Sequence, residues 1–161
     1  MPQVPNEYAV LTNLRDALAG IRVGDGFYYD VLGSAVKLDP NHDVDVLWAD
    51  GAPRPFVLVE LKSDTWEHMP SVRARIELRA TIHWIHDSDP KRDADKMQTY
   101  LQGCADIEKV IVSDLQRGGR VIDTRIVSRA FDTAVDGALV WASIDLAMPM
   151  IRTYGEPSVN V

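Results

Sequence analysis

Residues 75–86 show the pattern that most restricts how this chain can fold. Apolar side chains occupy every second position from Ile76 to Trp84, and charged or polar side chains occupy the positions between them. A strand places successive side chains on opposite faces, so this alternation predicts a long β-strand with one buried and one exposed face. The buried face of such a strand needs a second apolar layer to cover it.

Two segments have the spacing of amphipathic helices that could provide this layer. In the first, residues 7–22, leucine and isoleucine recur at helical spacing after a capping Asn6. The second is predicted to begin near Pro90 and to end before Gly118. Its expected apolar stripe comprises Met97, Tyr100, Leu101, Cys104, Ile107, Val110, Ile111 and Leu115. Gly103 lies inside this helix, where glycine costs about 1 kcal/mol relative to alanine, so we expect a kink or a close packing contact there.

The remaining segments complete an α+β pattern. Further strands are predicted at residues 24–39, 56–62, 119–131 and 139–151, and loops at 39–55 and 63–73. We therefore expect one domain over residues 1–161, with flexible arms at about 1–6 and 155–161. Its fold would be a mainly antiparallel β-sheet with two amphipathic α-helices packed on one face. Pro149 suggests that the strand from Leu139 to Met148 is an edge strand.

Composition excludes several classes of protein. Cys104 is the only cysteine, so an internal disulfide and a cysteine-based metal cluster are both impossible. No apolar stretch is long enough to span a bilayer, and the first residues lack a signal-peptide pattern. With 17 basic and 24 acidic side chains, the net charge of −7 disfavours a simple phosphate-binding surface. No glycine-rich phosphate loop is present, and we expect no cofactor.

One pattern resembles a catalytic site. Asp45 precedes a strand that ends in Glu60-Leu61-Lys62, which is the arrangement of PD-(D/E)XK-type nucleases. In that interpretation Asp45 and Glu60 bind Mg²⁺, and Lys62 orients or activates the attacking water. The same tripeptide is also typical of the polar face of a half-buried strand. The expected loop after Lys62, where that fold generally has a helix, and the negative net charge both argue against the nuclease. His83 and His86 lie three residues apart on a strand and therefore face opposite sides, so they do not form a metal site together.

Other residues indicate a binding surface. Trp66, His68 and Met69 occur in a segment flanked by acidic residues. Aromatic residues and methionine are enriched at interfaces, so these side chains are candidates for contacts with a partner. Leu139 and Trp141 on the predicted edge strand are further candidates, because an exposed edge can pair with the edge of a neighbour.

The order of elements in the second half resembles that of a known family. A long alternating strand leads into a helix that contains Asp106-Ile107-Glu108-Lys109-Val110-Ile111, followed by Asp114-Leu115 and Gly118-Gly119. A strand, an acidic loop and a last strand that ends near Tyr154 then follow. With the N-terminal amphipathic helix, this order is similar to that of the tail terminator (tail completion) proteins of long-tailed phages and prophages.

This resemblance implies a structural protein and no enzymatic activity. Members assemble into a ring, a homohexamer, that caps the tail tube, ends its polymerisation and joins the tail to the head connector. The implied partners are other copies of the chain, the tail tube protein and the connector protein, with DNA passing through without specific binding. The implied location is the head-proximal end of the virion tail, after assembly in the host cytoplasm. The nuclease and another neck or connector component remain as alternatives.

Overall fold

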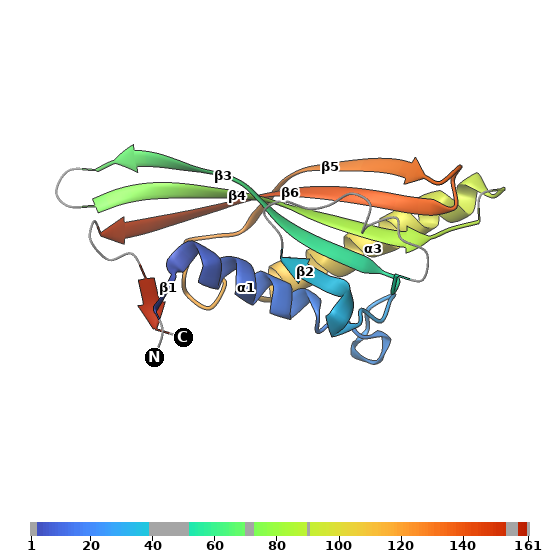
Figure 1. Ribbon diagram of the computed structural model, residues 1–161, viewed down its shortest axis with the longest axis horizontal. Helices are drawn as coiled ribbons and strands as arrows, with labels where there is room; N and C mark the ends of the chain where they lie inside the picture. The colour runs from blue at the N-terminus through green and yellow to red at the C-terminus, as the bar shows by residue number, and fades with distance from the viewer. Residues whose placement is uncertain (1–2, 39–51, 70–72, 90, 154–157, 161) are drawn as a thin grey trace.

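The computed structural model describes residues 3–38, 52–69, 73–89, 91–153 and 158–160. Two helices cover one face of a five-stranded sheet with the strand order β2-β3-β4-β6-β5 (Figure 1). The helices are α1 (Asn6–Leu18) and α3 (Asp93–Ser113), and the strands are β2 (Val36–Leu38), β3 (Phe56–His68), β4 (Arg73–Asp87), β5 (Arg125–Ala134) and β6 (Leu139–Thr153). Only the β2–β3 pair is parallel; the other three pairs are antiparallel. The predicted α+β class is confirmed.

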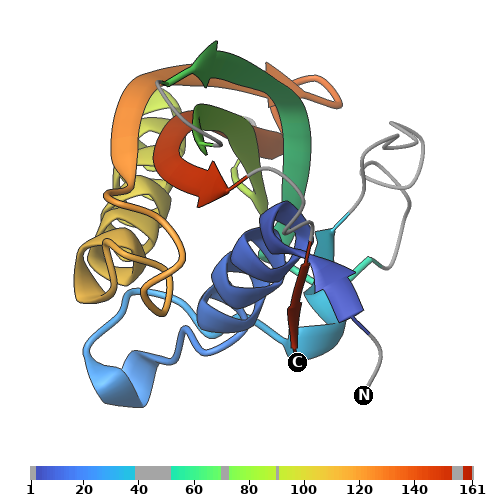
Figure 2. The ribbon, with the colours of Figure 1, turned by 90° about the vertical axis from the view of Figure 1, so that its left-hand side faces the viewer.

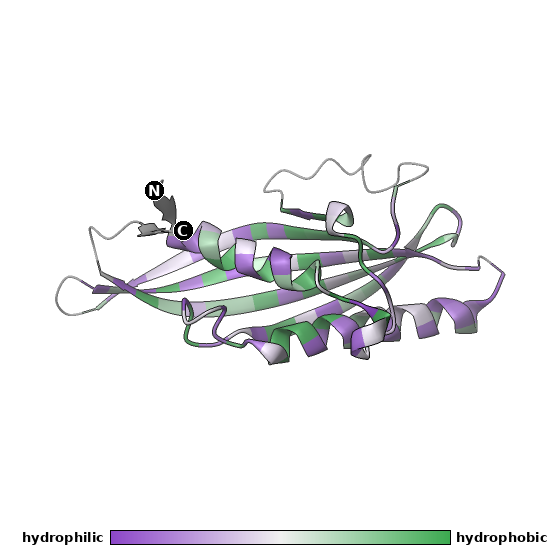
Figure 3. Cartoon of the chain, turned by 90° about the horizontal axis from the view of Figure 1, so that it is seen from below, coloured by the Kyte–Doolittle hydropathy of each residue, from purple (hydrophilic) through white to green (hydrophobic). Residues whose placement is uncertain are grey.

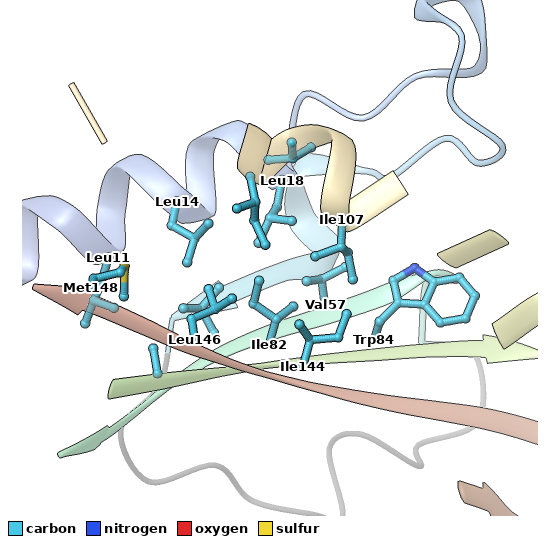
Figure 4. Close-up of a cluster of buried hydrophobic side chains, with 14 of the residues drawn as sticks. Leu11, Leu14, Leu18, Val57, Ile82, Trp84, Ile107, Ile144, Leu146 and Met148 are labelled. Atoms are coloured by element: carbon cyan, nitrogen blue, oxygen red, sulfur yellow. The ribbon is translucent and has the colours of Figure 1, made fainter. Parts of the chain in front are cut away.

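The inward face of β4 forms the centre of the core. Ile76, Leu78, Ala80, Ile82 and Trp84 are all buried, as their alternation predicts. Leucines of α1 and Ile107 of α3 pack onto this face, and Ile144 and Leu146 of the neighbouring strand β6 extend it (Figure 4). Full burial of one such side chain contributes about 1.5–3 kcal/mol, so this layer is the main source of stability.

Gly103 allows α3 to approach the sheet closely. A Cβ atom at this position would lie 2.7 Å from three carbon atoms of the Trp84 indole. That distance is far inside normal van der Waals contact, and the indole is itself fully buried and cannot move aside freely. The glycine is therefore explained by close packing, one of the two outcomes expected from the sequence.

The strand predicted over residues 24–39 is wrong except at Val36–Leu38, and residue 39 lies outside the described residues. The segment contains two 3₁₀ turns, Val23–Asp25 and Gly33–Ala35, before β2 begins at Val36. The carboxylate of Asp106 on α3 accepts hydrogen bonds from the backbone N–H groups of Tyr28 (2.8 Å) and Tyr29 (3.0 Å). Burial raises the pKa of Asp106 despite these bonds. The backbone of this segment is thus bound to a helix side chain and not to a neighbouring strand.

The loop predicted over residues 63–73 is also wrong for residues 63–68 and for Arg73, whereas residues 70–72 lie outside the described residues. Strand β3 continues to His68, and Thr65 to His68 pair with Glu77 to Ala74 of β4. A β-bulge between Leu61 and Ser63 shifts the register of this part. The side chains of residues 62–68 are exposed, so the segment lacks the apolar alternation that would reveal a strand. We refer to residues 60–68 of β3 as the β3 arm.

The prediction of β6 as an edge strand is wrong too. It lies between β4 and β5, and it continues through Pro149 to Thr153. Pro149 is aligned with Glu77 of β4, and its carbonyl oxygen accepts a hydrogen bond from the N–H of Ile122 (2.7 Å). The proline is tolerated inside the sheet because the β5 side of the pairing ends at Ala147, so that no strand needs its missing N–H there.

Helix α3 begins at Asp93, later than the start expected near Pro90, which lies outside the described residues. The single apolar stripe expected on this helix divides into two. Cys104, Ile107, Val110 and Ile111 face the core. Four other apolar side chains, Met97, Leu101, Val112 and Leu115, are exposed. At 100° per residue Met97, Leu101 and Val112 lie within a narrow sector of the helix surface, and Leu115 follows just after the helix ends at Ser113; we call these four residues the α3 outer stripe. The helix therefore has an apolar face that the described sheet does not cover.

Two short strands pair with each other where flexible arms are predicted. Strands β1 (Gln3–Pro5) and β7 (Ser158–Asn160) form an antiparallel two-stranded sheet. This small sheet lies beside α1, whereas the other end of the large sheet carries β5 and α3 (Figures 1 and 2). None of the helices in the described residues is both long and apolar enough to cross a membrane.

The contact between α3 and Trp84 predicts that Gly103→Ala destabilises the protein. Alanine favours helix by about 1 kcal/mol, but the added methyl group overlaps the indole, and overpacking typically costs about 1–3 kcal/mol. We expect a net loss in the free energy of unfolding, measured by urea denaturation. Gly33→Ala is the control, because a methyl group added there would meet no atom within 4 Å. Equal stability of the two variants would contradict the packing explanation.

Candidate functional site: the outer face and edges of the sheet

The sheet face opposite the helices, which we call the outer face, carries a network of polar side chains. Figure 3 shows the molecule from the helix side, with the outer face turned away from the viewer. Glu60 of β3, His83 and Thr81 of β4, and Asp145 of β6 project from the outer face in adjacent strands. Three of them, Glu60, Thr81 and His83, are buried, so their polar atoms require partners.

Glu60 and His83 form the centre of this network. His83 Nε2 lies 2.8 Å from Glu60 Oε2, and Lys62 Nζ lies 2.6 Å from the same oxygen. The indole N–H of Trp141 donates to His83 Nδ1 at 3.1 Å. Because an indole nitrogen can only donate, Nδ1 must be the unprotonated nitrogen, and Nε2 carries the proton that it donates to Glu60. The network thus selects one neutral tautomer of His83.

Asp145 has a separate set of hydrogen bonds. The hydroxyl groups of Thr81 and Ser128 donate to its two carboxylate oxygens, each at 2.6 Å. These two bonds lower the pKa of Asp145, with smaller contributions from the positive charge of Lys62 and from His83. The carboxylate bridges three neighbouring strands, β4, β6 and β5.

The residues of the predicted nuclease site are not brought together as a metal centre in the described chain. Asp45 lies outside the described residues. Glu60 and Lys62 share the outer face, as expected, but the Glu60 carboxylate is buried and binds Lys62 and His83. Among the described residues, no group of three or more His, Cys, Asp or Glu side chains is arranged to hold a metal ion. His86 faces Tyr29 and Trp84 on the helix side, so the two histidines point apart as expected.

Two hollows on the outer face are small. One of about 150 Å³ is lined by Ala130, Phe131, Asp132, Trp141 and Ser143. The other, of about 280 Å³, lies between Arg79 of β4 and Arg125 of β5. Sites for small molecules usually enclose roughly 300–1,000 Å³. These two hollows therefore give little support to a small-molecule substrate.

The candidate partner residues fall into two groups. Trp66 is 41% exposed on the helix-side face of the β3 arm, where its indole N–H donates to Asp64 and the guanidinium of Arg152 lies 5.5 Å from its ring. His68 ends the arm, and Met69 follows it with an exposed side chain. In the second group, Leu139 is buried against Phe56, and Trp141 is half-buried in the outer-face network. The second group is therefore part of the domain interior and not of an open edge.

The open edges of the sheet lie elsewhere. Strand β5 is the last strand on one side, and nine of its ten residues are aligned with β6 alone. On the other side, β2 pairs only with Val57 to Val59, so in the described chain the β3 arm has β4 as its one neighbour. The candidate edge at Leu139 to Met148 does not include these edges. The exposed side chains on both faces of β5, including Arg125 and Arg129, were the available signal, because charged residues commonly protect edge strands.

Comparisons with protein-family models and with curated proteins find no match to this chain.

The outer-face network predicts that Glu60→Ala lowers the free energy of unfolding more than Lys62→Ala does. Glu60→Ala removes the acceptor of a buried His83 N–H, and an unsatisfied buried donor costs about 1–3 kcal/mol. Lys62 has an exposed side chain, so Lys62→Ala is expected to change the free energy of unfolding by less than about 0.5 kcal/mol. Thermal and urea unfolding of both variants measure this difference. Similar losses in both would show that the Lys62–Glu60 ion pair, and not the buried histidine, dominates.

Asp145 predicts a pH-dependent contribution to stability. Because its pKa is lower in the folded protein than in the unfolded chain, the ionised carboxylate stabilises the fold above the ordinary carboxyl pKa range. This contribution is lost as the pH falls through the lowered pKa. We expect Asp145→Asn to reduce stability by about 1 kcal/mol at pH 7, a value discounted for partial exposure, and to match the wild type in strong acid. Urea unfolding as a function of pH tests this expectation, and a difference that is constant with pH would contradict it.

Proposed function

We propose that this chain is a structural subunit of the phage tail terminator type, which assembles with copies of itself into a ring at the end of a tail tube. The observation that carries the proposal is that, within the described residues, the sheet has two edges of different kinds on opposite sides, the β3 arm and β5, each paired on one side only. A surface that binds a different surface on the next copy forms a heterologous contact, and such contacts generate a ring when the rotation between copies closes.

The direction of the strands is compatible with such a ring. Strands β3 and β4, β4 and β6, and β6 and β5 are each antiparallel, so β3 and β5 run in opposite directions. Rotation about a ring axis inclined to the strands, as in a closed barrel, nearly keeps their directions and offsets neighbouring copies along the strands. The β3 arm of one copy would then meet β5 of the next copy as an antiparallel pair. Antiparallel pairing of this kind satisfies the backbone groups of both edges.

In this proposal the ring caps the tail tube and presents a surface to the head connector. Its partners are the tail tube protein, the connector protein and other copies of the chain, and its location is the head-proximal end of the virion tail. The net charge of −7 per chain suits a channel through which DNA passes, because repulsion prevents the DNA from binding during transit.

Assembly of the purified chain tests the proposal. Size-exclusion chromatography with light scattering is expected to give the mass of six subunits, with annular particles in electron microscopy. Dilution is expected to dissociate the ring reversibly. A monomer that persists at millimolar concentration, or a symmetric dimer, would overturn the proposal. A ring with another number of subunits would instead support a different neck or connector component.

A nuclease assay on the same sample tests the main alternative. Plasmid DNA is incubated with the chain and Mg²⁺, with Glu60→Gln as the matched variant that keeps the shape of the side chain. We expect no cleavage by either protein. Nicking that depends on Mg²⁺ and is lost in the variant would support the nuclease and contradict the structural role.

A further inference from the structure

We propose that the β3 arm of one copy docks between β5 and the α3 outer stripe of the next copy, and that two pairs of opposite charges set the register of this contact. The inference rests on the proposed function, because it names the surfaces through which the ring would form. The occupant is a second copy of this chain, since both complementary surfaces are present on the same subunit and on opposite sides of its sheet (Figure 1).

Charge supports one particular alignment of the two edges. The first half of β5 carries Arg125 and Arg129, whereas the second half of the β3 arm carries Asp64 and Glu67. In an antiparallel pair the start of one strand meets the end of the other, so the two basic residues come to lie beside the two acidic ones. Opposite charges across neighbouring strands stabilise their pairing.

The β-bulge in β5 makes this alignment more specific. Ile126 and Ser128 of β5 are aligned with the consecutive residues Leu146 and Asp145 of β6, so Val127 is the extra residue of the bulge. If Arg129 is placed opposite Asp64, the bulge brings Arg125 opposite Glu67. Side chains that lie directly opposite each other point to the same face.

In each of the two charge pairs, both side chains lie on the same face of the sheet. Arg129 is aligned with Ile144, and Asp64 with Leu78; both of these partners point into the core, so Arg129 and Asp64 lie on the helix side. Arg125 is aligned with Ala147 on the outer face. Glu67 is aligned with Arg75, which is likewise on the outer face. A single register therefore satisfies both charge pairs without a mismatch of faces.

The same alignment gives Trp66 an apolar contact. It places Trp66 opposite Ile126, and the side chains of both residues lie on the helix side of the sheet. The last turns of α3 lie close to this point, because the hydroxyl of Thr124 donates to the carbonyl oxygen of Leu115 at 2.7 Å. Trp66 of the arriving arm would therefore contact the end of the α3 outer stripe, where Val112 is 69% exposed.

The position of the stripe beside β5 is fixed within one subunit. Glu108 of α3 forms an ion pair with Arg129, and the ring of Tyr100 lies 5.1 Å from that of Phe131 on β5. Arg125 likewise lies 3.7 Å from Glu77 and 3.9 Å from Asp123. Helix and edge strand thus form one continuous surface that combines backbone groups, exposed arginines with acidic neighbours, and apolar side chains. The β3 arm offers backbone groups, negative charge and an indole, which is the complementary set.

Reversal of the charges on each edge tests this contact. The first variant, Arg125→Glu with Arg129→Glu, makes β5 negative, so that it repels the negative β3 arm of the next copy. The second variant, Asp64→Lys with Glu67→Lys, makes the β3 arm positive, so that it repels the positive β5 of the next copy. Each is expected to remain monomeric at concentrations about tenfold or more above those at which the wild type forms rings. An equimolar mixture is expected to form alternating rings, because each edge then meets an opposite charge. A chain with all four changes is expected to assemble alone.

Further variants and controls separate the possible outcomes. Trp66→Ala and Val112→Glu are expected to weaken assembly, whereas Val23→Glu, a change at another exposed valine, is not. Circular dichroism confirms that each variant is folded. If the wild type forms rings and the charge-reversed variants do so equally well, the proposed contact is overturned while the proposed function stands. If the two charge-reversed variants are folded and monomeric but their equimolar mixture does not assemble, the proposed register is overturned. If the wild type forms no ring, the proposed function itself fails, and this contact fails with it.

Discussion

Strand β4 lies in the middle of the sheet, and its inward side chains from Ile76 to Trp84 are buried beneath α1 and α3. The rest of the architecture depends on this burial. Covering one face with both helices leaves the other face without a second layer in the described chain, so its polar groups must find partners within the sheet. The fully buried indole of Trp84 also sets the distance of α3, because the helix can only pack against it at a glycine.

The polar side chains of the outer face find partners within the sheet, because donors and acceptors are matched. Trp141 donates to His83, His83 donates to Glu60, and Lys62 pairs with the same carboxylate. The Glu60-x-Lys62 pattern that suggests a metal site in the sequence is therefore also satisfied by contacts inside the sheet. Asp145 is held in the same way by two hydroxyl groups. Such networks favour one arrangement of neighbouring strands, because any shift of register would leave buried groups unpaired.

The strand order decides which strand edges have one neighbour only in the described chain. With β6 in the interior of the sheet, the edges pass to β5 and to the β3 arm, and these edges differ in charge and in the apolar side chains beside them. An open edge is a risk for non-specific association unless it is charged, covered or paired. In a ring of identical copies each edge would be paired by the other, which would explain why a chain with 25% charged residues keeps a tryptophan and several exposed apolar side chains near its edges.

Local patterns in the chain were sufficient to predict the elements in which one face is buried, namely the alternating strand β4 and the two amphipathic helices, and to mark Gly103 as a special position. Periodicity reports burial, so it is silent where both faces are exposed, as in the β3 arm, and where a segment is held by one distant side chain, as Asp106 holds residues 28–29. The strand order, the interior place of β6 and the division of the α3 stripe emerge only in the folded chain. In the folded chain, the buried guanidinium of Arg117 also donates to the carbonyl oxygen of Ile111 at the end of α3. The helix ends at Ser113, before the two glycines expected to end it. Pairing between segments far apart in the chain depends on the summed packing of all layers, and no local pattern encodes it.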